Sequence, residues 1–423
     1  MKTMIASVKG ARDFYPQEMA ARQWLYERLR KVSLRFGYEE YDGPFLEKLD
    51  LYAAKSGEEL VREQSFCFED RGGEMITLRP ELTPSLARMV AQRQSELIFP
   101  LRWWSFGPFW RYEKPQRGRT REFFQWNVDM IGVNSPEADA ELLGLAAEFL
   151  REVGLKPEQV IVRVNNRRLM DAQFAALEIA PHMRPAVLKL IDRREKMNAA
   201  AWDAYALEVG LSGEQLEGLK RLLADGDLWQ QSDDLQRVFS VLEAMGLREY
   251  FRYDANIIRG LEYYTGTVFE AFDVQESRAV LGGGHYDNLV ADVGGEPLAG
   301  VGFAMGDVVI SLVLKKYGLL PERWPGVADV LVTLFDMERS TAAFAFAMQL
   351  RRAGLRVVVY PEIAKLPKQF KFADRVGTRF VAILGPDEVA TGKVTLKDLV
   401  AHEQETLTQE QAIAFVQSRL GTV

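Results

Sequence analysis

The first part of the chain carries apolar residues at helical spacing, followed by a short extended segment. One apolar face is predicted within residues 17–36, formed by Leu25, Leu29, Val32 and Phe36. Gly37 suits the C-terminal end of such a helix. The segment Tyr38–Pro44 then predicts a strand that ends at a proline, and a proline belongs at a sheet edge or an interface.

Alternating apolar and polar positions predict the next elements. Residues 66–79 read as a hairpin turning at Arg71-Gly72-Gly73. Residues 101–132 predict two strands joined by a polar, basic loop, and a helix is expected at about 136–153. Residues 166–250 change character and read as helical throughout, so we expect a helical insertion between two strand-rich regions.

Strand patterns return at 251–273, and a helix is expected from about residue 305. A domain boundary is predicted near Leu320–Gly326, where Pro321, Pro325 and Gly326 cluster. We therefore divide the chain into residues 1–325 and 326–423. In the second part, strands at Val327–Phe335, Arg356–Tyr360 and Phe380–Leu384 and a helix at Thr341–Ala353 predict an α/β domain with a largely parallel sheet.

Composition places the chain among ordinary globular proteins. It has 423 residues, of which 48% are hydrophobic and 27% charged, and its net charge is −7. The single cysteine, Cys67, excludes an intrachain disulfide and fits a cytoplasmic location. No apolar run reaches the length of a membrane span, and no secretory signal is recognised. His182, His285 and His402 lie in three separate regions, so we expect no metal site.

Two segments contain residues that are suited to ligand binding and catalysis. Between Arg111 and Arg121 there are five basic residues and one acid, a composition that suits a polyphosphate or a nucleic-acid end but also a solvated loop. The segment Arg259–Gly266 combines a guanidinium, two phenols and two glycines. Its arginine can bind an anion through two parallel hydrogen bonds, and its glycines allow the backbone to approach a ligand closely. A strand with polar side chains in a purely structural sheet would show the same residues.

Together with Leu78–Thr83, these segments resemble the active-site motifs of histidyl-tRNA synthetases. Arg111–Gln125, followed by Asp129, resembles motif 2 of that family, Arg259–Gly266 its histidine-specific motif, and Leu78–Thr83 the segment that holds the amino acid. The helix and Tyr38–Pro44 resemble motif 1 of class II synthetases, which implies a homodimer. The resemblance implies an α+β catalytic domain with an antiparallel sheet, a helical insertion and a C-terminal α/β anticodon-binding domain.

The resemblance also implies a role for each matching residue. Glu81, Thr83 and Gln125 would hold the α-amino group of L-histidine, while Asp129 and Tyr264 would bind its imidazole with Tyr263 beside it. Arg111 and Arg259 would be catalytic and contact the α-phosphate of ATP. Glu113, Arg119 and Arg121 would complete the ATP site, with Mg²⁺ on the outer phosphates. The implied activity is that of a histidine–tRNA ligase, which forms histidyl-adenylate and transfers histidine to the 3′ end of tRNA(His).

Two positions depart from the family pattern. Gly300–Gly306 matches motif 3, but Val309 stands where an arginine that grips ATP is usual. Arg119 or Arg121 is our candidate to replace it. His285 stands where another arginine is usual. These departures concern the ATP side more than the amino-acid pocket.

The C-terminal domain is expected to bind tRNA. From Arg339 to Lys397 there are eleven basic and four acidic residues. Lys368-Gln-Phe370-Lys371 places two cations around an aromatic ring, which suits backbone contact and base stacking, although a solvated helix with one core phenylalanine also explains it.

Two other functions remain open at this point. One is a non-catalytic histidine-sensing paralogue, the regulatory subunit of ATP phosphoribosyltransferase, which Val309 favours. The intact Arg259–Gly266 motif and the C-terminal domain favour the ligase. The other is a general RNA-binding protein, which would leave Glu81, Gln125 and Asp129 unexplained.

Overall fold

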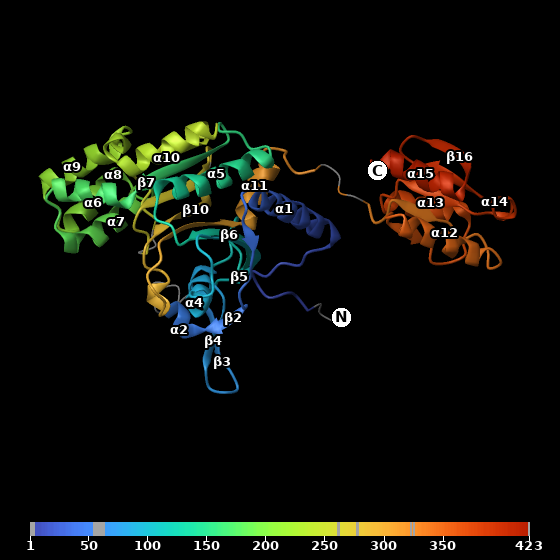
Figure 1. Ribbon diagram of the computed structural model, residues 1–423, viewed down its shortest axis with the longest axis horizontal. Helices are drawn as coiled ribbons and strands as arrows, with labels where there is room; N and C mark the ends of the chain where they lie inside the picture. Colours follow the sequence, from blue (N-terminus) through green and yellow to red (C-terminus); the bar gives the residue numbers. More distant parts are fainter. Residues whose placement is uncertain are drawn as a thin grey trace. The chain divides into compact units, whose positions relative to one another are not determined.

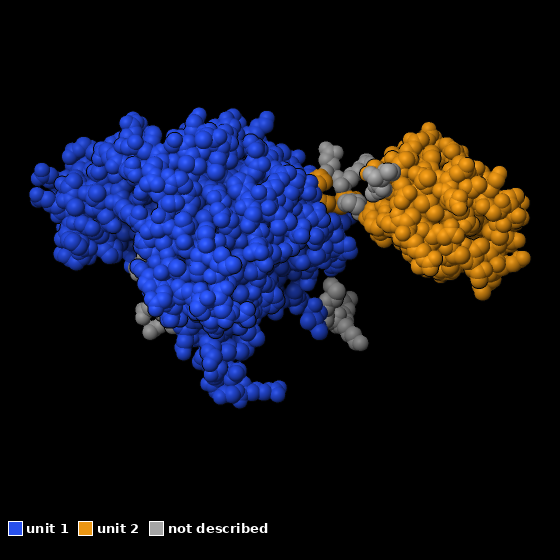
Figure 2. Space-filling view, viewed as in Figure 1, with its two compact units in different colours: residues 1–320 blue, residues 321–423 orange. Residues whose placement is uncertain are grey.

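The computed structural model describes residues 5–53, 64–259, 263–275, 279–321, 324 and 326–421. The chain forms two compact units, residues 1–320 and residues 321–423 (Figure 2). Gly260, Leu261 and Glu262 of the Arg259–Gly266 motif, and Pro325 of the predicted boundary, lie outside the described residues. None of the described helices is long and apolar enough to cross a membrane.

Unit 1 is built on an eight-stranded sheet (Figure 1). In spatial order its strands are β1 (Glu39–Glu40), β5 (Leu101–Trp110), β6 (Glu122–Ile131), β11 (Gly300–Gly306), β10 (Ala279–Tyr286), β9 (Thr267–Asp273), β7 (Val160–Asn166) and β8 (Phe251–Tyr253). All neighbours are antiparallel except the two edge pairs, β1 with β5 and β7 with β8. The expected antiparallel sheet of the catalytic domain is confirmed.

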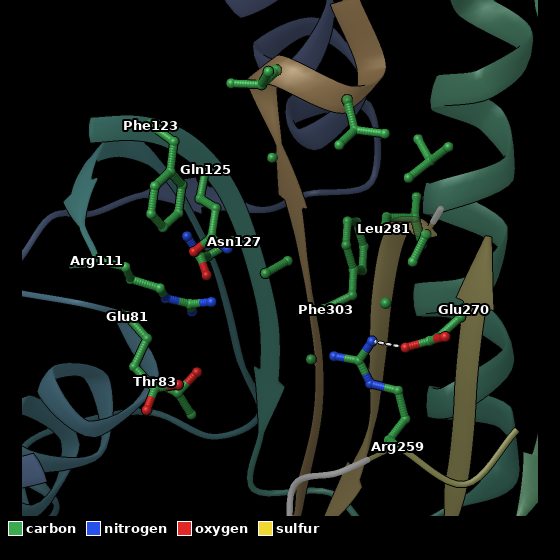
Figure 3. A pocket seen from close by; sticks show the side chains of 18 of the residues that line it. Glu81, Thr83, Arg111, Phe123, Gln125, Asn127, Arg259, Glu270, Leu281 and Phe303 are labelled. Carbon is green, nitrogen blue, oxygen red and sulfur yellow. Dashed lines mark hydrogen bonds and ion pairs between the residues drawn. The ribbon is translucent and has the colours of Figure 1, made fainter. Parts of the chain in front are cut away.

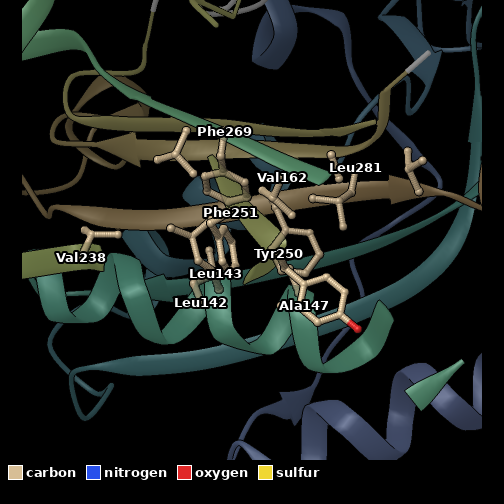
Figure 4. Close-up of a cluster of buried hydrophobic side chains, with 14 of the residues drawn as sticks. Leu142, Leu143, Ala147, Val162, Val238, Tyr250, Phe251, Phe269 and Leu281 are labelled. Carbon is tan, nitrogen blue, oxygen red and sulfur yellow. The ribbon is translucent and has the colours of Figure 1, made fainter. Parts of the chain in front are cut away.

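One face of this sheet packs on helices and forms the main core. Strand β6 shows the alternation: Trp126, Val128 and Met130 are buried among apolar side chains, and the residues between them point to the other face. The helices on the core side are α1 (Pro16–Arg35) and α5 (Pro136–Glu152). Ser135 begins α5 by accepting a hydrogen bond from the Ala138 amide. Figure 4 shows Leu142, Leu143 and Ala147 of α5 facing the strands.

The helical insertion lies between β7 and β8 and shares the same core. Its elements are α6 (Arg167–Ala176), η1 (Pro181–Met183), α7 (Arg184–Asp192), η2 (Arg194–Lys196), α8 (Ala199–Glu208), α9 (Gly213–Ala224), η3 (Leu228–Gln231), α10 (Asp233–Ala244) and η4 (Arg248–Tyr250). In Figure 1 these helices gather at one end of unit 1. Val238 of α10 belongs to the same cluster of buried side chains as Val162 of β7 (Figure 4). The insertion is therefore packed on the sheet rather than standing apart from it.

A smaller sheet carries the segment that leads into the site. Its order is β2 (Leu46–Lys48), β4 (Met75–Leu78) and β3 (Phe66–Glu69), which confirms the hairpin predicted at 66–79. Helices α2 (Leu49–Ala53) and α4 (Thr83–Arg93) follow β2 and β4. Along the sequence, η5 (Ala291–Val293) lies between β10 and β11, and α11 (Asp307–Lys316) follows β11.

Unit 2 has its own five-stranded sheet and its own core. The order is β13 (Val357–Val359), β12 (Val330–Val332), β14 (Phe380–Ile383), β15 (Lys393–Asp398) and β16 (Glu403–Thr408). Its helices are α12 (Ser340–Arg352), α13 (Leu366–Arg375), α14 (Pro386–Thr391) and α15 (Gln409–Leu420).

The sheet of unit 2 is mixed, which corrects the expectation of a largely parallel one. β13, β12 and β14 are parallel, but β15 and β16 add an antiparallel hairpin. The hairpin escaped prediction because β16 begins Glu403-Gln404-Glu405 and is mostly exposed, so it shows no apolar periodicity.

Candidate active site

A cavity of about 690 Å³ lies over the face of the large sheet opposite the main core. The three segments singled out in the sequence meet there. Its lining includes Glu81, Thr83, Arg111, Glu113, Arg119, Gln125, Asp129, Arg259, Tyr263 and Tyr264. Figure 3 shows Arg111 and Arg259 pointing into the cavity from opposite sides, with Glu81 and Thr83 below Arg111.

Arg259 is held in an unusual backbone conformation and a tight electrostatic setting. Its φ of 57° is left-handed, which is uncommon for a residue other than glycine. Its Nη1 donates to Glu270 Oε1 on β9. A Cβ on Gly282 would lie 2.1 Å from that Nη1, so only glycine admits the guanidinium here. Burial alone would lower the pKa of Arg259, but Tyr264 and Glu270 raise it, and the side chain stays cationic.

The Arg259 guanidinium still has an unused donor. Its Nε is buried and has no hydrogen-bond partner among the described residues. A buried charged donor without an acceptor is costly, and such groups are commonly satisfied by a ligand. An anionic group in the cavity would supply the acceptor.

Arg111 is fixed by the segment before α4. Its Nε donates to the Pro80 carbonyl oxygen at 2.9 Å, and its guanidinium lies 5.3 Å from the centre of the Phe123 ring. The remaining guanidinium nitrogens are directed into the cavity (Figure 3). The Tyr52 hydroxyl donates to the Glu81 carbonyl oxygen at 3.2 Å, which holds the turn that leads into Thr83.

Asp129 is the buried acid of the site. It is 5% exposed and accepts a hydrogen bond from the Tyr286 hydroxyl at 3.1 Å. Burial raises the pKa of Asp129 to about 7, and the hydrogen bond from Tyr286 opposes that rise. The rings of Tyr263 and Tyr264 have centres 4.7 Å apart, and Tyr263 meets Tyr286 edge-on. Aromatic rings thus enclose a carboxylate that can accept a hydrogen bond from a ligand.

Two arginines of the basic loop, Arg119 and Arg121, differ in whether they line the cavity. Arg119 lines the cavity, is 63% exposed and pairs with Glu113 at 3.2 Å. Arg121 does not line it: its guanidinium stacks over the Tyr112 ring at 4.0 Å and its Nε donates to the Glu113 carbonyl oxygen at 3.2 Å. The geometry favours Arg119 over Arg121 as the cation that a ligand in the cavity can reach.

Val309 lines the cavity together with Val308, at the start of α11. It is half-buried and packs against the main core. Asp307, the first residue of the helix, accepts from Arg12 Nη2 and from the Phe124 amide, both at 2.9 Å. This end of the cavity is therefore apolar at the position of the usual arginine.

Sequence reasoning missed three residues of the site. Glu270 pairs with Arg259, Tyr286 donates to Asp129, and Asn127 lines the cavity with an amide nitrogen that has no partner among the described residues. The alternation of β6 could have found Asn127, because it lies between Gln125 and Asp129 on the same face. His285, in contrast, does not line the cavity.

No group of three side chains of the metal-ligating types is arranged to hold an ion among the described residues. Three of the acids that line the cavity are engaged by other side chains: Asp129 by Tyr286, Glu113 by Arg119 and Glu270 by Arg259.

Comparisons with known proteins agree along the whole chain. The family model for histidyl-tRNA synthetase matches residues 10–307, and that for an anticodon binding domain matches residues 329–419. A histidine–tRNA ligase of Leptospira biflexa is 34% identical over 99% of both chains. One of Haloarcula marismortui is 39% identical over 95% of both. The crystal structure of histidyl-tRNA synthetase from Nostoc sp. PCC 7120 superposes with a TM-score of 0.85 at 27% identity, covering 99% of this chain and 100% of that one. The chain belongs to the histidyl-tRNA synthetase family.

Proposed function

We propose that the protein is a histidine–tRNA ligase, which activates histidine with ATP and transfers it to the 3′ end of tRNA(His). The observation that carries the proposal is the pair Arg111 and Arg259, which face each other across one cavity (Figure 3). The same cavity holds a buried acid, Asp129, among tyrosine rings. Two fixed cations and a polar pocket for a small amphipathic side chain suit an amino acid and a nucleotide.

The amino-acid end is assigned to the Asp129 side of the cavity. Asp129 would accept from one imidazole nitrogen and Tyr264 would bond the other, with Tyr263 packed beside the ring. Glu81, Thr83 and Gln125 supply carboxylate, hydroxyl and amide oxygens for the α-ammonium group. A buried pocket of this kind rejects apolar amino acids, because they would leave its polar groups unpaired.

Adenylation then requires the histidine carboxylate to attack the α-phosphorus of ATP, so that the new acyl–phosphate bond forms as the bond between the α- and β-phosphates breaks and pyrophosphate leaves. Arg259 would bridge the carboxylate and the phosphate, using the buried Nε that has no partner among the described residues. Arg111 would contact the same phosphate from the other side. The two cations reduce repulsion between the anions and stabilise charge on the phosphate oxygens, so positioning and electrostatics replace a strong base. Mg²⁺ would enter with ATP and neutralise its outer phosphates, and Glu113 lines the cavity where a carboxylate could add a ligand.

Arg119 is proposed to take the outer phosphates in place of a cation at Val309. Changing Arg119 to alanine should raise the KM for ATP about tenfold, since a charged hydrogen bond contributes about 1.5–3 kcal/mol. The dissociation constant for histidine should not change. ATP titrations of pyrophosphate exchange measure the first quantity and calorimetry the second.

Two variants sharpen the comparison. Arg117→Ala removes an exposed cation of the same loop that does not line the cavity, and its KM should stay at the wild-type value. Val309→Arg should lower the KM for ATP and relieve the Arg119→Ala defect. Equal KM values for the Arg119 and Arg117 variants would remove Arg119 from the ATP site.

Unit 2 is proposed to bind the anticodon. On α13, Lys368 pairs with Glu362, Gln369 is buried and holds Leu334 through both main-chain groups, and Lys371 is exposed. Phe370 is half-buried and packs in a small core cluster with Lys397 Nζ 5.1 Å from its ring centre. Of the residues predicted for RNA contact, Lys371 is therefore the most available to phosphates, and Phe370 presents only part of its ring.

Lys371→Glu should raise the KM for tRNA in aminoacylation about tenfold, because a phosphate contact is replaced by repulsion. Histidine-dependent pyrophosphate exchange, which needs no tRNA, should be unchanged. Lys393→Glu places the same charge change at an exposed position on β15 and is the matched control. A loss of exchange in the Lys371 variant would point to a folding defect rather than to RNA contact.

We also propose a cytoplasmic homodimer. The support is the resemblance of α1 and the following extended segment to motif 1, and the half-exposed apolar Phe45 and Leu46 beside Pro44. Sedimentation at micromolar concentration tests it, and a monomer would contradict it.

Histidine-dependent ATP–pyrophosphate exchange, screened over all twenty amino acids without tRNA, tests the function. Exchange with histidine alone is expected. Histidine binding without exchange would favour the second candidate, a histidine-sensing regulatory subunit, which the apolar Val309 supports.

A further inference from the structure

His285 is buried behind the amino-acid pocket and faces a carboxylate at each ring nitrogen. It is 2% exposed. Nδ1 lies 2.8 Å from Asp139 Oδ1, in the first turn of α5, and Nε2 lies 3.3 Å from Asp287 Oδ1. A neutral imidazole donates from one nitrogen only, whereas the imidazolium donates from both. The doubly protonated form is thus the one that satisfies both carboxylates.

The same residue touches the histidine-specific segment directly. The Thr265 amide donates to the His285 carbonyl oxygen at 2.9 Å. A Cβ on Gly266 would lie 3.1 Å from His285 Cβ and 3.2 Å from two ring carbons, so the ring packs closely against that glycine. Tyr263 and Tyr264 immediately precede these residues and line the cavity.

The next residue of β10 reaches the pocket from the other side of the strand. Tyr286 lines the cavity and donates to Asp129 at 3.1 Å, while His285 points away from it towards α5. A shift of β10 at His285 would therefore move both the Asp129 partner and the Tyr263–Gly266 segment.

We infer that His285 is a positioning residue for the amino-acid pocket: its imidazolium, held between Asp139 and Asp287, fixes Tyr263–Gly266 and Tyr286 in the geometry that binds the substrate. The inference rests on the proposed binding of histidine. The ring touches no substrate, so its effect falls on affinity for the amino acid rather than on the chemical step.

Charge around the ring supports the protonated state. Asp139 from α5 and Asp287 after β10 face it, Arg168 of α6 lies 3.5 Å from Asp287, and Asp234 of α10 lies 3.3 Å from Arg168. Burial opposes protonation, but the hydrogen bond and charge of Asp139 outweigh it and raise the pKa of His285. Deprotonation at alkaline pH removes one of the two donors.

The test compares wild type, His285→Gln and His285→Arg by calorimetric titration with histidine between pH 6 and pH 9. At pH 7 the glutamine variant should bind histidine about tenfold more weakly, the size expected for losing one charged hydrogen bond. In exchange assays its KM for ATP should be unchanged, and its kcat at saturating histidine should stay within about threefold. The arginine variant, with a permanent charge, should bind as wild type does at pH 7.

The pH profile separates positioning from a plain packing defect. Wild-type affinity should fall towards that of the glutamine variant as pH rises, while the arginine variant shows no such fall. Titration of the substrate itself affects all three proteins equally, so it cancels in the affinity ratios.

Asp139→Asn is a second test that keeps the imidazole in place. It removes the charge of the nearer carboxylate and should weaken histidine binding in the same direction. Binding within twofold of wild type in both the Gln and Asn variants, or a wild-type-to-Gln ratio that is constant with pH, would overturn the inference. Absence of histidine binding in wild type would instead overturn the proposed function.

Discussion

Arg259→Ala should lower the rate of histidine-dependent pyrophosphate exchange by about three orders of magnitude while part of the histidine affinity survives. Arg259 is one of two cations placed on opposite sides of the cavity, and fixed cations at a transferring phosphoryl group contribute about that much. Its removal also leaves Glu270 as an unpaired anion beside the proposed position of the phosphates. Single-turnover formation of labelled adenylate measures the chemical step, and calorimetry measures histidine binding.

Two further variants separate these effects. Arg259→Lys keeps the charge but cannot bridge two anions as a planar fork, so we expect intermediate activity. Adding Glu270→Gln to Arg259→Ala removes the unpaired carboxylate and should restore about tenfold of the lost rate. Turnover close to wild type in Arg259→Ala would exclude Arg259 from catalysis.

Asp129→Asn should reduce kcat/KM for histidine by about a thousandfold. Asp129 is the buried acid proposed to accept from the imidazole, and its amide replacement presents one acceptor fewer and adds a donor that would face the substrate N–H. The KM for ATP should change little, since ATP is assigned to the other end. Exchange kinetics with each substrate varied in turn would show this split, and equal losses for both substrates would contradict it.

The same substitution should stabilise the protein without ligand. The folded-state pKa of Asp129 is raised from 3.8 to about 7, so the stability it contributes is complete below pH 3.8 and is lost as pH rises to about 7. Asparagine at this position cannot ionise, so the variant loses no stability in this way as the pH rises. The melting temperature of Asp129→Asn should therefore exceed that of wild type, by about 2 °C or more at pH 8 and by less at pH 5.5. The control is Asp50→Asn, an exposed acid, which should show no such trend.

Much of the fold followed from local patterns because those patterns reflect burial on one face. The predicted helix at about 136–153 corresponds to α5, and the strand–loop–strand at 101–132 corresponds to β5 and β6. The sheet of unit 2 was only partly predicted. Its three parallel strands are apolar, whereas β16 is an edge strand whose exposed polar residues give no periodic signal.

The site was predictable where one short segment carries several functional groups, as in Arg259–Gly266. Contacts between side chains from different elements could not be predicted. Arg259 precedes β9 and reaches Glu270 of that strand next to Gly282 of the neighbouring β10, and Tyr286 of β10 reaches Asp129 of β6 across β11. Arg121, predicted for the ATP site, does not line the cavity: its guanidinium lies over the Tyr112 ring and its Nε donates to the Glu113 carbonyl oxygen. Sequence gives the type of side chain, but its direction depends on long-range register.

The apolar start of α11 has a consequence for inhibitor selectivity. With Val309 at the cavity wall, the outer phosphates, which ATP carries and an adenylate does not, would be held by the exposed Arg119 without a second arginine from α11. The two cations proposed for the α-phosphate, Arg111 and Arg259, would serve both molecules equally. Mimics of histidyl-adenylate that keep an anionic linker should therefore compete with ATP more effectively here than against a relative with arginine at this position. An added aliphatic group directed at Val308 and Val309 would bury apolar surface there and bind this enzyme selectively.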